Sequence, residues 1–311
     1  MDARPLLFTL WSIGLWALLL VVSRIVLVRY DIDPWSFAFV QLLIGGVVLV
    51  AVAGGGEAVD WRSLRRPATW AYGALRVTTA SAFTAALVHT TVAYAGMLGT
   101  VSVPLAVIGA GVLFGRRPSR REIGGHVVIL IGIGLLIGLR LEGGLGNPAV
   151  VLMLISELAV VGSSLIAETH PDNNAESPQV RRRFTGTVLL ITAAAFLVGR
   201  VAQRGALDVA DDLGPALWIS GLVVGAALRG PAMHASLRAI RLVGADVYLM
   251  LAASLAFIGL VLELGSGALG VIERPAIGPV DLLLVAVIAA GSLWVFRTRQ
   301  AVAAVAGPSV D

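Results

Sequence analysis

The sequence predicts an all-α integral membrane protein of ten transmembrane helices, arranged as two inverted five-helix repeats around a central cavity. Three observations lead to this fold class. Of the 311 residues, 58% are hydrophobic and 14% are charged, with a mean hydropathy of +0.90, which is more apolar surface than a water-soluble domain can bury. The apolar residues fall into ten runs, each near the roughly 20 residues that cross a bilayer. The two halves of the chain also resemble each other.

Proline, glycine and charged residues separate the ten runs. Lipid offers no partners to backbone N–H and C=O groups, so each run is expected to be helical. The first run lacks a small-residue cleavage site, which predicts an uncleaved spanning helix rather than a signal peptide. The expected spans cover residues 6–28, 35–53, 69–87, 92–114, 122–140, 148–167, 184–202, 215–234, 245–265 and 279–297.

Arginine positions predict the orientation of these spans. All 23 basic residues are arginine, and with the N-terminus inside, 15 fall in inner segments and 5 in outer segments. This asymmetry follows the positive-inside rule. We therefore expect a multi-pass protein of the bacterial cytoplasmic membrane with both termini cytoplasmic. The other three arginines, Arg24, Arg76 and Arg229, lie within the expected spans.

An internal repeat relates the two halves. Shifting the chain by 153 positions aligns residues 73–76 (GALR) with 226–229 (AALR), so that Arg76 and Arg229 become equivalent. A unit of five helices ends on the side opposite to where it began, so the second copy must be inverted. Inverted repeats are typical of secondary transporters, with the substrate site near the midplane. The expected repeats cover residues 1–141 and 142–311.

A family resemblance supports this division. The stretch from Ala86 through Pro104 to residues 115–136 (GRRPSRREIGGHVVILIGIGLL) resembles helices 3 to 5 of EamA-type permeases of the drug/metabolite transporter superfamily. In the second half, residues 273–275 (ERP) match the family's turn, whereas Arg116 stands where the family usually has Glu. The resemblance implies a ten-helix permease with cytoplasmic termini that moves small metabolites through a central cavity.

Arg76 and Arg229 are the strongest candidates for a substrate site. An arginine at mid-helix costs roughly 2.5–3.5 kcal/mol on insertion scales, so such residues usually face a water-filled cavity or a partner. Tyr72 and Thr79 share the helix face of Arg76 and are expected to line the same cavity. The Gly-Pro pair after Arg229 is expected to break or kink that helix. A second interpretation stays open for Arg229, because it lies near the inner end of its expected span and could snorkel.

Glu157 is the only acidic residue deep within an expected span. One interpretation makes it a proton-coupling carboxylate of the substrate site, and another the counter-ion of Arg76 or Arg229. A third is a static ion pair that locks helices together. Charge alone does not choose between them.

Two further polar or aromatic residues have two interpretations each. Gln41 is expected either to hydrogen-bond between helices or to line the cavity, and Trp16 either to line the cavity or to face lipid. Charged residues near span ends are tolerated easily, so we interpret three of them as boundary residues: Arg24, Asp246 and Glu263.

Two glycine spacings predict close helix packing. Gly134 and Gly138 form one small-xxx-small pair, and Gly221 and Gly225 form another. Such pairs let two helix backbones approach each other.

Several chemistries are excluded. The chain has no cysteine, which rules out disulfides and thiolate metal sites, and its four histidines are scattered without metal-ligand spacing. No P-loop is present. A net charge of +4 is too small to indicate nucleic acid. We expect no enzyme activity, no metal and no cofactor.

The expected function is secondary active transport, as an exporter of a small polar metabolite. Two arginines against one deep carboxylate favour a substrate with a carboxylate or phosphate, such as an amino acid or organic anion, with H+ as a candidate coupling ion. A flippase for a lipid-linked carrier and a non-transporting receptor are the alternatives. The expected partners are this substrate, H+ and membrane lipids, with the protein a monomer or homodimer.

Overall fold

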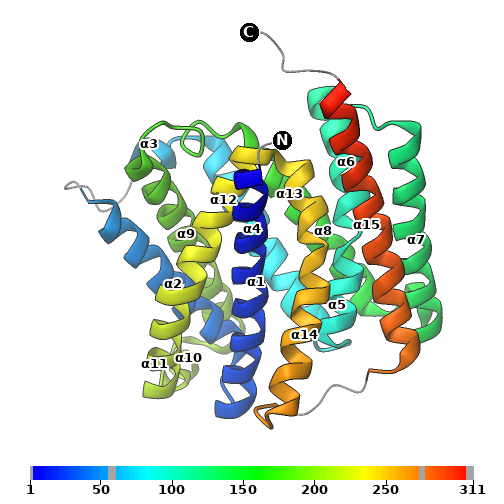
Figure 1. The fold of residues 1–311 in the computed structure, drawn as a ribbon. Helices are drawn as coiled ribbons and strands as arrows, with labels where there is room; N and C mark the ends of the chain where they lie inside the picture. The colour runs from blue at the N-terminus through cyan, green and yellow to red at the C-terminus, as the bar shows by residue number, and fades with distance from the viewer. Residues whose placement is uncertain (1–2, 55–60, 273–276, 306–311) are drawn as a thin grey trace.

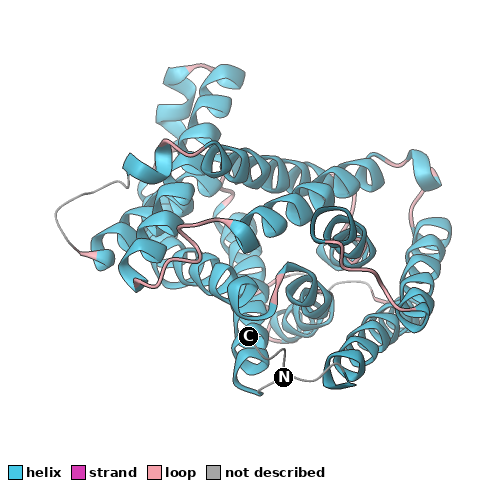
Figure 2. Ribbon diagram, turned by 90° about the horizontal axis from the view of Figure 1, so that it is seen from above, coloured by secondary structure: helices cyan, strands magenta, loops and turns pink. Residues whose placement is uncertain are grey.

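The computed structural model describes residues 3–54, 61–272 and 277–305. Helices make up 86% of the chain, and the described residues contain helices and loops without a strand. Figure 2 looks down on the bundle, with many helices seen close to end-on. The turn at residues 273–275, which carries part of the family resemblance, lies outside the described residues.

The first half of the chain begins with two long helices and ends with a third (Figure 1). Between them lie one short helix, α3, and the expected span 92–114, which is divided into two helices, α5 and α6. The helices of this half are α1 (Ala3–Tyr30), α2 (Pro34–Ala53), α3 (Trp61–Leu64), α4 (Pro67–Ala86), α5 (Val92–Gly99), α6 (Ser102–Phe114) and α7 (Arg120–Arg140).

The second half follows the short turn η1 (Gly144–Gly146) and contains two further divided spans. The expected span 215–234 is longer than predicted, because its helical segment continues to Val243. The helices are α8 (Pro148–Thr169), α9 (Pro178–Arg204), α10 (Ala206–Asp212), α11 (Pro215–Val224), η2 (Gly225–Arg229), α12 (Gly230–Val243), α13 (Ala245–Ala252), α14 (Ser254–Ala268) and α15 (Pro279–Val305).

Nine helical segments of the described chain are long and apolar enough to cross a bilayer. They correspond to nine of the ten expected spans. The remaining expected span, residues 69–87, is the 20-residue helix α4, which is of similar length but is not among the nine. Its sequence is more polar than the others, because it carries Arg76 and several threonine and serine side chains.

The two halves are packed into each other rather than side by side. The most extensive helix contacts are α2 with α9, α7 with α15, and α4 with α8, and each of these pairs joins the first half to the second. Proline is the first residue of six of the described helices, where its missing N–H costs nothing. A capping box of Ser119 and Glu122 starts α7.

Glycine sets the closest helix crossings, but not always the glycines expected. A Cβ at Gly186 would lie 2.9 Å from the Gly46 carbonyl oxygen where α9 crosses α2, and one at Gly125 would lie 3.0 Å from the Gly291 carbonyl oxygen where α7 crosses α15. The prediction for Gly221 and Gly225 is confirmed, because both lie against α2, where Cβ atoms would fall 2.4 and 2.7 Å from its atoms.

The prediction for Gly134 and Gly138 is wrong. A Cβ at either position would meet nothing within 4 Å, so these two glycines do not carry the packing of α7. The reason is helix direction: the face of α7 that meets α15 carries Gly125 and Gly132 instead, and a small-residue spacing does not say which face of its helix is covered.

The beginning of α1 and the end of α15 lie at the same end of the bundle (Figure 1), which we call the termini end. The α6–α7 connection and α3 also lie there, and both carry arginines expected on the inner side. We call the opposite end, which contains the α1–α2 connection, the far end.

Candidate functional site

Two arginines from different halves of the chain meet at one tryptophan. The Cζ atom of Arg76 on α4 lies 5.4 Å from the centre of the Trp16 ring, and that of Arg229 on η2 lies 5.2 Å from it. Both distances are within the range of cation–π attraction. Trp16 on α1 therefore faces the arginines and not lipid alone, and three of the candidate residues form one cluster.

A π-helical turn places Arg229. The Gly230 N–H donates to the Gly225 carbonyl five residues back, so η2 inserts a wider turn into an otherwise continuous segment. Pro231 follows in the first turn of α12 and has no N–H for a regular bond. The expected break at Gly230 and Pro231 is thus a π-bulge, a feature that often occurs at functional sites.

This continuity argues against snorkelling by Arg229. The helical segment runs for 29 residues, from Pro215 to Val243, and Arg229 is in its middle. At 1.5 Å per residue, either end is about 20 Å away. Arg229 therefore lies further from a helix end than a span ending near residue 234 would place it.

Helix α2 supports the π-helical turn from behind. A Cβ at Gly45 would lie 3.0 Å from the Gly225 carbonyl oxygen and 3.1 Å from the Gly230 nitrogen, so the two backbones are in contact. Gln41 lies one turn earlier on α2, is 7% exposed, and its Oε1 atom has no hydrogen-bond partner in the described chain. No interhelical hydrogen bond from this oxygen is present among the described residues, and both interpretations of Gln41 stay predictions.

Two buried tyrosines complete the aromatic surroundings. Tyr72 on α4 lies within electrostatic range of both arginines, and its hydroxyl group donates to the Met233 sulfur at 4.0 Å. Tyr248 on α13 lies within electrostatic range of Arg76, with its hydroxyl group beside Ser236 and Ser12. Tyr248 was not among the site residues predicted from the sequence. The only feature of the sequence that could have indicated it is a single tyrosine within an apolar run.

Thr79 and Glu157 lie on facing helices next to this cluster. The Ser156 hydroxyl on α8 donates to the Thr79 backbone carbonyl at 3.3 Å, while the Thr79 hydroxyl oxygen is buried without a partner in the described chain. Glu157 is 8% exposed and lies within hydrogen-bonding reach of Ser102. A Cβ at Gly99 would lie 3.3 Å from its Oε1 atom.

Within the part of the chain that the structure describes, Glu157, Arg76 and Arg229 take part in no ion pair. The carboxylate of Glu157 lies within electrostatic range of Arg76 but forms no ion pair with the Arg76 guanidinium group. Each ion pair found involves other residues, near the helix ends. A static lock between Glu157 and the arginines is therefore absent from this arrangement.

At the far end, two ion pairs hold α1 and α7 to α14 and α15. Arg24 on α1 donates to the Glu263 carboxylate on α14, which is 1% exposed. Arg140 pairs with Asp281 at 2.7 Å. Arg24 and Glu263 are near span ends as expected, but they pair with each other, with Glu263 buried, rather than being independent boundary charges. We call them the outer pair.

At the termini end, five residues form a network that we call the inner cluster. Arg116 pairs with Glu168 at 2.6 Å and with Asp246 at 3.5 Å, and Arg299 pairs with Asp246 and, at 4.0 Å, with Glu122. Asp246 is 2% exposed, so it too is more than a boundary residue. The network connects α7, α8, α13 and α15 with the α6–α7 connection.

Two cavities lie outside the arginine cluster. One of about 110 Å³ adjoins the outer pair and is lined by residues that include Tyr94, Met97 and Asp281. A groove of about 600 Å³ lies between α4 and α9. Neither is lined by Arg76 or Arg229.

Comparison with known proteins identifies the first half. Residues 4–138 match the family model of the EamA-like transporter family. This half of the chain belongs to the EamA-like transporter family. The family is part of the drug/metabolite transporter superfamily, so a membrane protein with a role in transport is established at this level.

A fold similarity extends over the whole chain. A solved structure described only as "Crystal structure of protein" is similar over 97% of this chain and 99% of its own, with a TM-score of 0.67 and 18% identity. At this identity the likeness shows the fold alone. No curated protein matches the chain.

Proposed function

We propose that this EamA-like protein is a secondary active transporter that exports a small polar metabolite carrying a carboxylate or phosphate, of the amino-acid or organic-anion class. The observation that carries the proposal is the meeting of Arg76 and Arg229 at Trp16, with no carboxylate paired to either in the described chain. Two cations within spanning helices and without a counter-ion are costly, and an anion that binds between them would offset this cost. The rings of Trp16 and of the two buried tyrosines, Tyr72 and Tyr248, would form the walls around an anion bound to the two arginines.

The proposed architecture is ten helices in two inverted repeats, residues 1–141 and 142–311, with α4 as the tenth span. Reciprocal ion pairs at the two ends of α7 and α15 support this symmetry. Arg140 pairs with Asp281 at one end, and Arg299 with Glu122 at the other. The same separation of 159 positions relates Glu122 to Asp281 and Arg140 to Arg299, as a two-fold axis in the membrane plane requires.

In the proposed cycle, the two ends open in turn. The outer pair joins α1 to α14, and the bond between Arg116 and Glu168 in the inner cluster joins the end of α6 to α8. These contacts join equivalent helices of the two proposed repeats, with the charges exchanged. Breaking one set while the other stays closed would give alternating access to the arginine cluster. The proposed location is the bacterial cytoplasmic membrane, with the termini end cytoplasmic.

Glu157 is the proposed proton-carrying group. It is buried beside α5 and α6, within electrostatic range of Arg76, and free of an ion pair among the described residues. A proton taken up here changes the charge that Arg76 experiences, which couples proton and anion binding. Proton movement against export of the anion would then supply the driving force.

The test is counterflow in liposomes with purified protein and a panel of amino acids and organic acids. Arg76→Ala and Arg229→Ala should each abolish flux of the active substrate, whereas Arg297→Ala should not, because Arg297 is exposed on α15. Glu157→Gln should keep exchange of substrate for substrate but lose net, proton-driven transport. Unchanged flux in both well-folded arginine variants would refute the assignment, as would transport of cationic drugs alone.

A further inference from the structure

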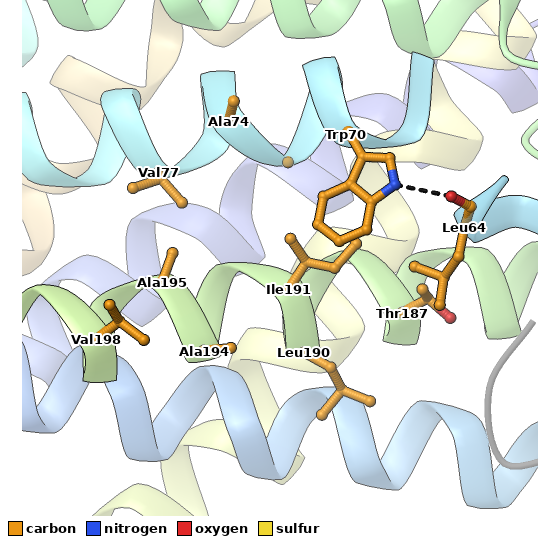
Figure 3. A pocket seen from close by; sticks show the side chains of 11 residues that line it. Leu64, Trp70, Ala74, Val77, Thr187, Leu190, Ile191, Ala194, Ala195 and Val198 are labelled. Carbon is orange, nitrogen blue, oxygen red and sulfur yellow. Dashed lines mark hydrogen bonds between the residues drawn. The ribbon is translucent and has the colours of Figure 1, made fainter. Parts of the chain in front are cut away.

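The groove between α4 and α9 is a candidate site of a different kind. It has a volume of about 600 Å³ and is lined mainly by apolar side chains (Figure 3). Trp70, Ala74 and Val77 of α4 form one wall, and residues of α9 from Thr187 to Val198 form the other. The indole N–H of Trp70 donates to the Leu64 carbonyl at 2.7 Å, so its polar atom is satisfied and the ring is held at one end of the groove.

The groove opens away from the arginine cluster. Positions 70, 74 and 77 lie on one face of α4, while Arg76, with Tyr72 and Thr79, lies on roughly the opposite face at 100° per residue. Trp70 is 53% exposed and Val198 is 68% exposed. The groove therefore faces the surroundings of the bundle, which in a membrane is lipid.

The length of the groove matches one leaflet. Eleven helical steps separate Thr187 from Val198 on α9, which is about 16 Å at 1.5 Å per residue. Half of a hydrocarbon core of about 30 Å is about 15 Å. With its Trp70 end at a membrane surface, the groove would reach to about the midplane, as a single acyl chain does.

Positive charge is concentrated at the end marked by Trp70 and Thr187. Arg65 is exposed just before α4, and Arg66 is the N-cap residue of that helix. Arg183 is four residues before Thr187 and so lies on the groove face of α9. Its guanidinium group donates to the Gly54 carbonyl, and Arg66 pairs with Asp172 at 3.5 Å with its side chain 42% exposed.

We propose that this groove binds one acyl chain of an anionic phospholipid from the leaflet at the termini end, with the phosphate of its headgroup beside Arg65 and Arg183. Three features of the groove fit this occupant. Its apolar walls are as long as one leaflet is thick, the amphipathic ring of Trp70 lies at one end, and the arginines lie just beyond that end. Basic residues near a membrane surface attract anionic lipid headgroups. Because α4 and α9 come from different halves, the lipid fills a gap between them.

The first arm of the test measures lipid retention. Purified protein is exchanged into phosphatidylglycerol or phosphatidylcholine with identical acyl chains, and bound lipid is counted by native mass spectrometry. We expect about tenfold greater retention of phosphatidylglycerol, a higher melting temperature with it, and no effect of inorganic phosphate. Stabilisation by inorganic phosphate alone, or equal retention of both lipids, would overturn the proposal.

The second arm fills the groove. Ala194→Trp and Ala74→Trp place an indole in it from opposite walls and should each remove the bound lipid. Ala289→Trp is the matched control, because Ala289 is also exposed but lies on α15. Two groove variants are used so that the test still stands if one of them misfolds. Lipid retention at the wild-type level in either folded variant would contradict the site.

The third arm removes charge. Arg183→Gln should lower the preference for phosphatidylglycerol, whereas Arg297→Gln, at the same end but on α15, should leave it unchanged. Equal effects of both would indicate general attraction to the surface and overturn a specific site. Arg229→Ala should retain the lipid, and because retention is measured without transport, its outcome is separate from that of the proposed function.

Discussion

The outer pair provides the sharpest test of how this bundle is closed. Replacing Arg24 by glutamine leaves the Glu263 carboxylate, 1% exposed, without its cation. Breaking a buried ion pair by removing one partner costs about 3–5 kcal/mol. Arg24 itself is 32% exposed, so water screens part of the interaction and the expected loss is about 2–3 kcal/mol.

The assay is thermal unfolding in detergent, with Arg29→Gln as a control. Arg29 is exposed at the end of the same helix, and its loss should change stability by less than about 0.5 kcal/mol. At about 2 °C per kcal/mol for a large domain, Arg24→Gln should lower the melting temperature by about 4–6 °C. The reversed pair, Arg24→Glu with Glu263→Arg, should recover most of this loss.

A second measurement connects the pair to opening of the far end. The chain has no cysteine, so Met97→Cys places a single thiol on the cavity next to the outer pair. Met97 is 1% exposed, and labelling by a maleimide should be slow with Arg24 present and several-fold faster with Arg24→Gln. Unchanged labelling and an unchanged melting temperature would refute the idea that this pair closes the far end.

Two further predictions concern packing and pH. Gly186→Ala should destabilise the protein by about 1 kcal/mol, since overpacking against the Gly46 carbonyl exceeds the gain in helix propensity, whereas Gly134→Ala, with open space around its Cβ, should be neutral or stabilising in the same unfolding assay. Burial lowers the pKa of His170 below its usual value near 6.5, although nearby Asp172 acts in the opposite direction. The neutral form of His170 therefore stabilises the fold above pH 6.5. This stabilisation declines as the pH falls toward the lower pKa of the folded state. His170→Asn should flatten the fall in melting temperature between pH 7 and 5, and an identical pH profile would contradict this.

The hydrogen bonds of His170 fit the neutral form that its burial favours. Its Nδ1 atom accepts from the Asp172 backbone N–H at 3.2 Å, and Nε2 lies 3.1 Å from the Thr69 hydroxyl group. Protonation of Nδ1 would remove the first of these bonds. The ring also stacks on Phe184, which keeps it out of water.

The candidate site was only partly visible in the sequence. Arg76 and Arg229 stood out because a charge within an apolar run is rare, and the repeat related them. The sequence did not predict that both arginines lie against Trp16. A tryptophan on a spanning helix faces either the cavity or lipid, and which of the two depends on the rotation of the helix. Tyr248 was missed for the same reason.

The sequence by itself determined the class of the protein, the approximate limits of nine long apolar helices of the described chain, and the family of its first half. Run length, hydropathy and arginine placement decide these features locally, through the thickness of the bilayer and the hydrogen-bonding needs of a backbone in lipid. Only the tertiary structure decided which glycines are crossing points, which span-end charges pair, and that the segment around Arg229 continues through a π-helical turn. These depend on helix rotation and on partners more than a hundred positions away, as for Arg24 and Glu263, which no local pattern specifies.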